Sequence, residues 1–377
     1  MWRRRASILV IGPTPPPFHG VAVNTRALLD CEVINRDFDL VHLDTADRRT
    51  LANLGRFDWT NVWLALKHAV LFAGKLVGHR PRVVYVPICQ NTLGFLRDCL
   101  FMLPAILTGR KLVLHLRGGY FRRFYETAPS VLKSLIRYIL AHTSRVIVLG
   151  NNLRCIFEGL VPDGRIVVIP NGLDPEPFER LRTQARPARD GYQVTYLGSL
   201  QEGKGYQFVL RAAPVVLKQL SDVHFTWAGS FRRPDEAAWC AQFIQERRLQ
   251  ETASFPGVVT GDEKVELLLR SHVFVFPTQY DLEGHPMVIL EAMAAGLPVI
   301  TTDQGAIRET VLDSVNGFIV PKGDPKAIAK KIVLLLQDDD LRRRMGQASR
   351  ERFLEHYALD RWANDMVRVF QGVLEKD

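Results

Sequence analysis

Residues 280–300 read YDLEGHPMVILEAMAAGLPVI, a short apolar helix set between two signals that reverse the chain. Pro286 suits the first helical position, and Gly284 frees the turn before it. Gly296, followed by Pro298, ends the helix after about three turns. The start of a helix presents unpaired N–H groups and a partial positive charge, so this stretch predicts a binding site for a phosphate group.

Two carboxylates bracket the predicted helix. Glu283 precedes it, and Glu291 lies five residues beyond Pro286, or roughly 7 Å further along the axis. A carboxylate at that distance can take two ribose hydroxyls while the phosphates of the same nucleotide rest at the helix start. The alternative is a buried helix followed by a strand, with Glu291 on its solvated side. The stretch alone leaves both interpretations open.

Size and composition place the chain among soluble globular proteins. Its 377 residues exceed what one core usually serves, which favours two domains. The opening MWRRRASILVIG predicts a first strand and not a signal peptide, and later apolar segments fall short of the ~20 residues of a membrane span. The five cysteines are scattered without metal-type spacing, so we expect a cytoplasmic protein without structural zinc.

Positive charge is confined to the first half of the chain. Residues 1–178 hold 23 Lys and Arg against 13 Asp and Glu, whereas residues 179–377 hold 26 against 27. Between Arg48 and Arg154 the imbalance sharpens to 17 basic against 3 acidic residues. This asymmetry predicts an anionic partner for the first half only: nucleic acid, a membrane surface or a phosphorylated acceptor.

Short β-branched runs alternate with helical patterns throughout the first half, which is typical of a parallel sheet covered on both faces. The loop GPTPPPFHGVAVN delivers His19 and Gly20 to the carboxyl edge of that sheet, where ligands collect in such folds, unless it is only a stiff connector. His115 ends the run KLVLH at the same edge, where either a reactive or a structural histidine fits. The expected strands are SILVI, FDLVHL, RVVYVP, KLVLHL, RVIVL and RIVVIP.

Three helical segments of the first half combine apolar, aromatic and basic residues. They are NVWLALKHAVLFAGKLVG, TLGFLRDCLFMLPAIL and GGYFRRFYETAPSVLKSLIRYIL. Basic residues interleaved with aromatics suit a surface that rests on an anionic leaflet, so we expect residues 48–154 to contact a membrane. Ordinary helices covering a sheet, or a nucleic-acid surface, would give a similar pattern.

The domain limits follow from changes in pattern. We expect a first domain over residues 1–178 and a linker over 179–191, where proline and charge lack an apolar period. A second doubly wound domain should span 192–355, and a final amphipathic helix over 356–377 should cross back to the first domain. The expected strands of the second domain are YQVTYLG, HFTWAG, TASFPG, VFVFP, LPVITT and GFIVP.

A glycine-rich turn follows the first strand of the second domain. It reads SLQEGKGYQ and sets Lys204 between Gly203 and Gly205. Glycines let a backbone approach phosphate oxygens, and the lysine adds a point charge. The turn lacks the spacing and the Ser or Thr of a Walker loop. It should share one sheet edge with residues 280–300 and with the loop TTDQGAIRETV, which carries Gly305 and Glu309.

These motifs together resemble the retaining nucleotide-sugar glycosyltransferases of GT-B fold, glycosyltransferase family four, over most of residues 7–375. The resemblance rests mainly on PTQYDLEGHPMVILEAMAAGLPVITTDQGAIRETV and the following NGFIVPKGDPKAIAKKI, with support from IPNGLDPEPF and GPTPPPFHGVA. It implies two Rossmann-like domains that face each other across a cleft and close on a nucleotide sugar.

The resemblance also implies roles for individual residues. Glu291 would bind the ribose hydroxyls, Lys204 the diphosphate, and Glu283 the donor sugar. Gly20 would approach the phosphate from the other domain, and His115 would touch the sugar near the reacting carbon. The donor pocket would be completed by Gly284, His285, Pro286 and Met287. Many relatives carry an arginine directly after the glycine that ends the strand, whereas this chain has Ser199 after Gly198.

We therefore expect a metal-independent hexosyltransferase without a cofactor, which moves a hexose from a nucleotide-diphosphate sugar to a glycan or lipid-linked acceptor. The setting would be bacterial surface polysaccharide synthesis at the inner face of the cell membrane. The alternatives are a nucleotide-sugar epimerase of the same fold and a glycoside hydrolase using Glu283 and Glu291, which requires carboxyl groups about 5 to 9.5 Å apart. A basic nucleic-acid-binding protein is a third alternative, from a different class.

Overall fold

The computed structural model describes residues 5–16, 20–46, 59–183 and 191–375. These residues form two compact units. The first unit comprises residues 1–172 together with 360–377, and the second comprises residues 173–359. His19, Arg48, Arg49 and Arg56, which belong to the predicted loop and basic region, lie outside the described residues.

A parallel six-stranded sheet forms the centre of the first unit, in the order β2-β1-β3-β4-β5-β6. Its strands are rich in Val, Ile and Leu and are largely buried, as expected when helices cover both faces. The order reverses between β1 and β3, so the sheet is doubly wound. The strands are β1 (Ala6–Gly12), β2 (Phe38–Asp44), β3 (Val83–Ile88), β4 (Lys111–Leu116), β5 (Arg145–Val148) and β6 (Ile166–Val168).

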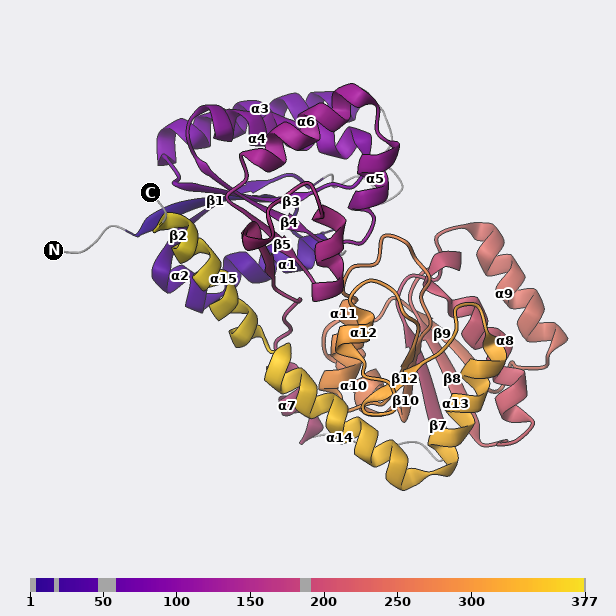
Figure 1. Ribbon diagram of the computed structural model, residues 1–377. Coiled ribbons are helices and arrows are strands. Elements are labelled where there is room, and N and C mark those ends of the chain that lie inside the picture. Colours follow the sequence, from indigo (N-terminus) through magenta and orange to yellow (C-terminus); the bar gives the residue numbers. More distant parts are fainter. Residues whose placement is uncertain (1–4, 17–19, 47–58, 184–190, 376–377) are drawn as a thin grey trace. The chain divides into compact units, whose positions relative to one another are not determined.

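Helices cover both faces of this sheet. Helices α3, α4 and α6 lie on one face, and α1, α2 and α15 lie on the other (Figure 1). The helices are α1 (Gly20–Asp30), α2 (Glu32–Asp37), α3 (Trp59–His79), α4 (Thr92–Leu107), α5 (Phe121–Thr127) and α6 (Ser130–Ala141), with 3₁₀ turns at Asn151–Phe157 and Asp163–Arg165.

The last helix, α15 (Leu359–Leu374), packs on the first unit although it follows the whole second unit in the chain. Its apolar face buries Trp362, Met366 and Phe370. The ring of Phe370 meets the rings of Phe38 and Tyr85 edge to face, with centroids 5.6 and 6.1 Å apart. The helix therefore completes the core against strands β2 and β3.

The second unit repeats the architecture with a parallel sheet in the order β12-β11-β10-β7-β8-β9. The order reverses between β7 and β10, which is where ligands bind in open α/β sheets, beyond the carboxyl ends of the strands. The strands are β7 (Tyr192–Leu197), β8 (Val223–Ala228), β9 (Ala253–Gly257), β10 (Val273–Phe276), β11 (Val299–Thr301) and β12 (Gly317–Ile319).

Helices again occupy both faces, with α8, α9 and α13 on one and α10, α11 and α14 on the other (Figure 1). They are α7 (Glu176–Arg182), α8 (Tyr206–Leu217), α9 (Pro234–Glu246), α10 (Gly261–Leu269), α11 (Met287–Ala294), α12 (Ile307–Thr310), α13 (Pro325–Gln337) and α14 (Asp339–His356), with a 3₁₀ turn, η4, at Glu202–Lys204.

The structure confirms the predicted fold class, and each run predicted as a strand coincides with one of these strands. The predicted linker differs from the structure. Residues 179–182 belong to α7, whose Phe178 and Leu181 are buried in the core of the second unit, and residues 184–190 lie outside the described part. The first unit thus ends at Gly172 and not at residue 178, and the final helix begins at Leu359.

Candidate functional site

The turn after β7 is built on glycines that bring its backbone against the loop after β10. Gly205 has a φ of +82°, and a Cβ added there would lie 2.2 Å from the carbonyl oxygen of Pro277. The N–H of Gln279 donates to the carbonyl of Gly203 at 2.9 Å. The two loops on either side of the switch point are therefore one packed structure, and a larger residue at position 205 would force them apart.

Lys204 and Glu283 meet at this point. The Nζ of Lys204 lies 2.6 Å from the Oε2 of Glu283, and their side chains are only 18% and 10% exposed. The hydroxyl of Thr278 donates to the same carboxylate oxygen at 3.2 Å. The ammonium also lies 4.7 Å from the centre of the Tyr280 ring, a cation–π contact. The sheet edge thus holds a positive and a negative charge side by side with little solvent around them.

Glu291 is also buried and paired. It projects from α11, and its Oε1 lies 2.6 Å from the Nζ of Lys264 on α10. The side chain of Glu291 is 8% exposed, so the alternative that placed it on a solvated helix face is wrong. The sequence shows Lys264 only as one of several charges in GDEKVE, and no spacing signal marked it as the partner of Glu291.

Helix α11 begins directly after this turn, with Pro286 as its N-cap and Met287 as its first residue. The prediction that Pro286 is the first helical residue was therefore off by one position. The first-turn N–H groups of a helix have no acceptor within it, so α11 presents donors and the positive end of its dipole beside Glu283. A phosphate-bearing ligand suits this position.

His285 supports the turn from within. Its side chain is buried, and its Nε2 forms a 2.9 Å hydrogen bond with the hydroxyl of Thr310. Burial lowers the pKa of His285 to about 3, so its ring is neutral at physiological pH. In this structure His285 ties the turn before α11 to Thr310 at the end of α12.

The loop after β11 fixes the other side of the turn. Gly305 has a φ of +56°, and a Cβ there would lie 2.3 Å from the carbonyl oxygen of Gly284 and 2.5 Å from that of Glu283. The N–H of Ala306 donates to the carbonyl of Gly284 at 2.7 Å. The carbonyl of Glu309 accepts from the hydroxyl of Tyr357 at 3.1 Å. The predicted approach of this loop to the sheet edge is therefore confirmed.

Ser199 contributes its backbone at the edge of this site. Its carbonyl accepts from the hydroxyl of Tyr196 at 3.1 Å and from the N–H of Gln201 at 3.0 Å. The preceding Gly198 has a φ of +145°. A serine at position 199 supplies no charge for a phosphate, so the role of Ser199 stays a prediction that rests on its backbone and hydroxyl.

The first unit holds the two remaining predicted site residues. Gly20 is the first residue of α1, and a Cβ added to it would meet no atom of the described residues within 4 Å. His115 lies on β4 with 0% of its surface exposed, and its Nδ1 bonds with the hydroxyl of Tyr85 at 2.8 Å. Burial, with the nearby charge of Arg117, holds the pKa of His115 well below its usual value.

The environment of His115 differs from the environment that was expected for a reactive histidine at the open edge of the sheet. Strand β4 continues to Leu116, so position 115 is still inside the sheet and its ring packs edge to face on Tyr85. Arg117 follows the strand and donates to the side-chain oxygen of Asn171 at 2.7 Å and to Tyr85 at 3.1 Å. The charged group at the end of β4 is therefore Arg117, which no motif of the sequence marks as a site residue.

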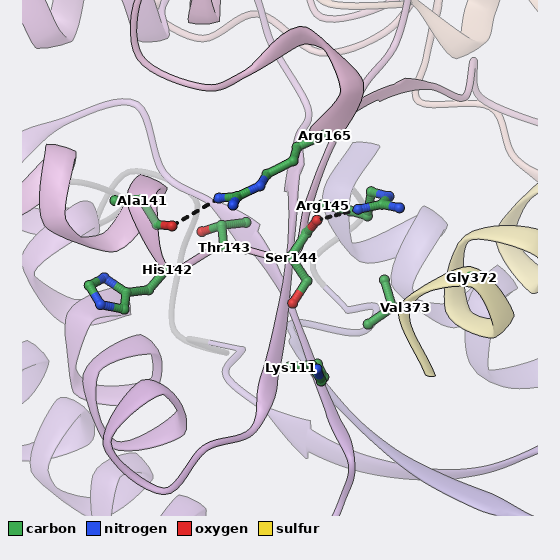
Figure 2. A pocket seen from close by; sticks show the side chains of 9 residues that line it. All are labelled: Lys111, Ala141, His142, Thr143, Ser144, Arg145, Arg165, Gly372 and Val373. Atoms are coloured by element: carbon green, nitrogen blue, oxygen red, sulfur yellow. Dashed lines mark hydrogen bonds between the residues drawn. The ribbon is translucent and has the colours of Figure 1, made fainter. Parts of the chain in front are cut away.

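A hollow in the first unit lies away from these residues, at the amino ends of β4 and β5 (Figure 2). Arg165 and Arg145 line it and donate to the backbone carbonyls of Ala141 and Ser144 at 2.9 and 2.8 Å. The other lining residues are Lys111, His142, Thr143, Gly372 and Val373. Carboxyl-end residues such as Gly20 belong to the opposite edge of this sheet. Among the described residues, no group of three or more His, Cys, Asp or Glu is placed to hold a metal ion.

The comparison with known families concerns the second unit. Residues 177–352 match the family model described as Glycosyl transferases group 1. The phosphatidyl-myo-inositol mannosyltransferase of Mycobacterium leprae is 33% identical over 208 residues, which cover 55% of this chain and 54% of that protein. The uncharacterized glycosyltransferase MJ1607 of Methanocaldococcus jannaschii is 27% identical over 57% of this chain and 56% of its own. The chain spans about half the length of the curated relatives that it matches.

Solved structures show the fold over the whole chain. A glycosyltransferase from Rickettsia africae ESF-5 matches with a TM-score of 0.79 and 17% identity, and the match covers 100% of both chains. HepE of Anabaena, solved in complex with UDP, matches with a TM-score of 0.74 and 17% identity over 97% of this chain and 100% of its own. The chain is therefore a protein of GT-B fold. Residues 177–352 of its second unit are similar to the glycosyl transferases group 1 family.

Proposed function

We propose that this protein is a retaining glycosyltransferase that moves a hexose from a nucleotide-diphosphate sugar to a glycan or lipid-linked acceptor. The observation that carries the proposal is the placement of two buried Lys–Glu pairs at α11, which follows the switch-point strand β10: Lys204–Glu283 just before the helix and Lys264–Glu291 within it. Each pair joins two separate elements, and removing four charges from water has a cost that their pairing offsets only in part.

The arrangement fits the parts of a nucleotide sugar in order. The diphosphate takes the ammonium of Lys204 and the N-terminal amides of α11, and this positive charge acts in place of a metal ion. Glu291, held in orientation by Lys264, accepts from the two ribose hydroxyls. Glu283 accepts from hydroxyls of the hexose, and its pairing with Lys204 joins sugar recognition to diphosphate recognition. UDP in the complex of the Anabaena protein is a ligand of the same class.

The transfer step follows from these positions. The bond between the anomeric carbon and the diphosphate oxygen breaks, and its electron pair leaves with the diphosphate. The acceptor hydroxyl oxygen bonds to the same face of the anomeric carbon, and its proton passes to the departing diphosphate oxygen. Preorganised donors such as Lys204 stabilise the charge that develops on the leaving group. The roles of Gly20, Ser199 and His115 remain predictions, and the buried ring of His115 would act by supporting strand β4.

The first unit carries a surface that suits a lipid-linked acceptor. Helix α3 exposes Trp59, Trp63, Leu66, Val70 and Val77, which recur at intervals of three, four or seven residues along one side of the helix. Each of these side chains is more than half exposed. The neighbouring helix α4 exposes Leu93, Leu96, Leu100 and Leu107. We call these residues of α3 and α4 the apolar face.

Positive charge accompanies the apolar face. The ammonium of Lys67 lies 5.4 Å from the centre of the Trp63 ring, and residues 48–154 carry 17 basic against 3 acidic side chains. Exposed apolar surface within a basic region suits the interface of an anionic leaflet. We therefore propose that the protein works at the inner face of a bacterial cell membrane in surface polysaccharide synthesis. None of the described helices is both long and apolar enough to span a bilayer.

A nucleotide screen tests the proposed function first. The melting temperature of the protein is measured with UDP, GDP, ADP and their hexose conjugates, since a ligand at 100 times its dissociation constant adds about 2.7 kcal/mol to the folded state. We expect one base to stabilise the protein and its hexose conjugate to be consumed when acceptor lipids are added. The anomeric configuration of the product, determined by NMR, then tests retention. No stabilisation by any nucleotide would contradict the proposal.

A further inference from the structure

Two loops of the second unit are joined next to the position where the expected phosphate-binding arginine is replaced by Ser199. Leu200 forms an isolated β-bridge with Phe231, and its N–H donates to the carbonyl of Ser230 at 2.8 Å. The N–H of Arg232 returns a bond to the carbonyl of Leu200 at 3.3 Å. The turn after β7 and the turn after β8 therefore run side by side, which brings residue 232 to the turn that contains Ser199.

Glycine makes this approach possible. Gly229, which follows β8, has a φ of +152°, and a Cβ there would lie 1.9 Å from the carbonyl oxygen of Gly198. The N–H of Gly198 in turn donates to Ala228 at 3.0 Å. The backbone pairing is thus fixed by main-chain contact, and the position of residue 232 does not depend on a flexible side-chain interaction.

The side chain of Arg232 is exposed and contacts the turn after β7. Its Nε donates to the side-chain oxygen of Gln201 at 3.3 Å. Burial raises the pKa of Tyr280, and the charge of Arg232 opposes that rise. The ammonium of Lys204 lies 4.7 Å from the centre of the same Tyr280 ring. Tyr280 therefore feels the charge of Arg232 and also makes a cation–π contact with Lys204.

Arg232 differs from its neighbour in having no carboxylate within ion-pair distance among the described residues, whereas Arg233 pairs with Asp235 at 3.0 Å. A guanidinium with five donors that is not committed to a carboxylate is suited to phosphate oxygens. We propose that Arg232 is the second phosphate-binding cation of this site and supplies, from the turn after β8, the charge that position 199 lacks. This inference rests on the proposed function, since it concerns the diphosphate of the same donor.

The test compares Arg232→Gln with Arg233→Gln, a matched control that removes an adjacent exposed arginine. Wild-type protein is first titrated calorimetrically with UDP, GDP and ADP, and the tightest-binding nucleotide is then compared with its monophosphate. Arg232→Gln is expected to weaken diphosphate binding at least tenfold and monophosphate binding less than threefold. Arg233→Gln should match the wild type for both ligands. Because Arg232 is exposed and makes one long side-chain hydrogen bond, the melting temperature should not change.

The outcomes separate the two proposals. Wild-type affinity of Arg232→Gln for the diphosphate would overturn the assignment of Arg232 and leave the proposed function intact. An equal loss for monophosphate and diphosphate would also overturn it, because the effect would then not lie at the second phosphate. If the wild type bound none of the three nucleotides, the proposed function itself would fail, and the assignment of Arg232 with it.

Discussion

Lys204 and Glu283 form an ion pair of 2.6 Å between the first turn of the second sheet and the turn that precedes α11. The two residues stand 79 positions apart in the chain, and the switch point of the sheet brings them together. Their pairing means that the charge proposed for the diphosphate and the carboxylate proposed for the sugar cannot be altered independently.

Replacing Lys204 should therefore affect both catalysis and stability. We expect Lys204→Ala to lower kcat/KM for sugar transfer at least tenfold, which corresponds to about 1.4 kcal/mol of transition-state stabilisation. The buried carboxylate of Glu283 would also lose its charged partner, at a cost of about 1–3 kcal/mol in the free energy of unfolding. Sugar transfer is measured as the release of the nucleoside diphosphate. Stability is measured by unfolding the protein with urea. Lys218→Ala, at an exposed position after α8, is the control, and unchanged turnover in Lys204→Ala would refute the site.

The proposed contact between Glu291 and the ribose can be tested with two nucleotides that differ only in their ribose hydroxyls. Glu291→Gln should weaken binding of the preferred nucleoside diphosphate about tenfold, or about 1.4 kcal/mol, because an amide accepts less well from two hydroxyls than a carboxylate does. The 2′,3′-dideoxy analogue should bind the wild type and Glu291→Gln equally. Glu266→Gln changes an exposed carboxylate on α10 and should leave both affinities unchanged. An equal loss for the two ligands would mean that Glu291 acts through packing.

Acidification should destabilise the second unit through His285. Its pKa is lowered to about 3 in the folded protein, so the unfolded chain binds more protons below pH 6.5, and stability falls as the pH decreases from 6.5 toward 3. Between pH 7.0 and 5.5 this histidine alone should remove about 1 kcal/mol. Urea unfolding of His285→Asn should lack that share of the pH dependence. Replacing the exposed His79 in the same way should retain it, and an unchanged pH dependence in His285→Asn would contradict the prediction.

Membrane contact should depend on the apolar face of α3. The wild type is expected to co-sediment with vesicles containing anionic phospholipid, and Trp63→Glu together with Val70→Glu should weaken that binding at least tenfold. Val258→Glu replaces a comparably exposed apolar residue of the second unit and should bind as the wild type does. Absence of vesicle binding in the wild type would refute membrane contact, and salt-sensitive binding of duplex DNA would favour the nucleic-acid alternative.

Much of the fold was predictable because most strands are compact runs of β-branched, aromatic or other apolar residues between turn signals, as in SILVI and VFVFP. The linker was not. Phe178 and Leu181 lie three residues apart among charged neighbours, and such a short apolar signal does not reveal that α7 packs into the second core. The predicted end of the first domain, at residue 178, therefore lies after the observed end at Gly172.

The site was predictable where one short motif supplies the geometry, as with Glu283 and α11. It was not predictable where a partner comes from a distant element. Lys264 reaches Glu291 from another helix, and Arg232 approaches through a pairing of two loops. His115 shows the converse: its place near the end of a strand was visible, but its hydrogen bond with Tyr85 of the adjacent strand was not.

Helix α15 has a consequence for biosynthesis. The first unit takes one wall of its core from residues 360–374, so that core stays open while the entire second unit is being translated. Phe38 and Tyr85 lack their Phe370 contact throughout this period. The first unit is thus completed only after the second unit has been translated, and a fragment of residues 1–172 would expose that apolar wall and be prone to aggregate.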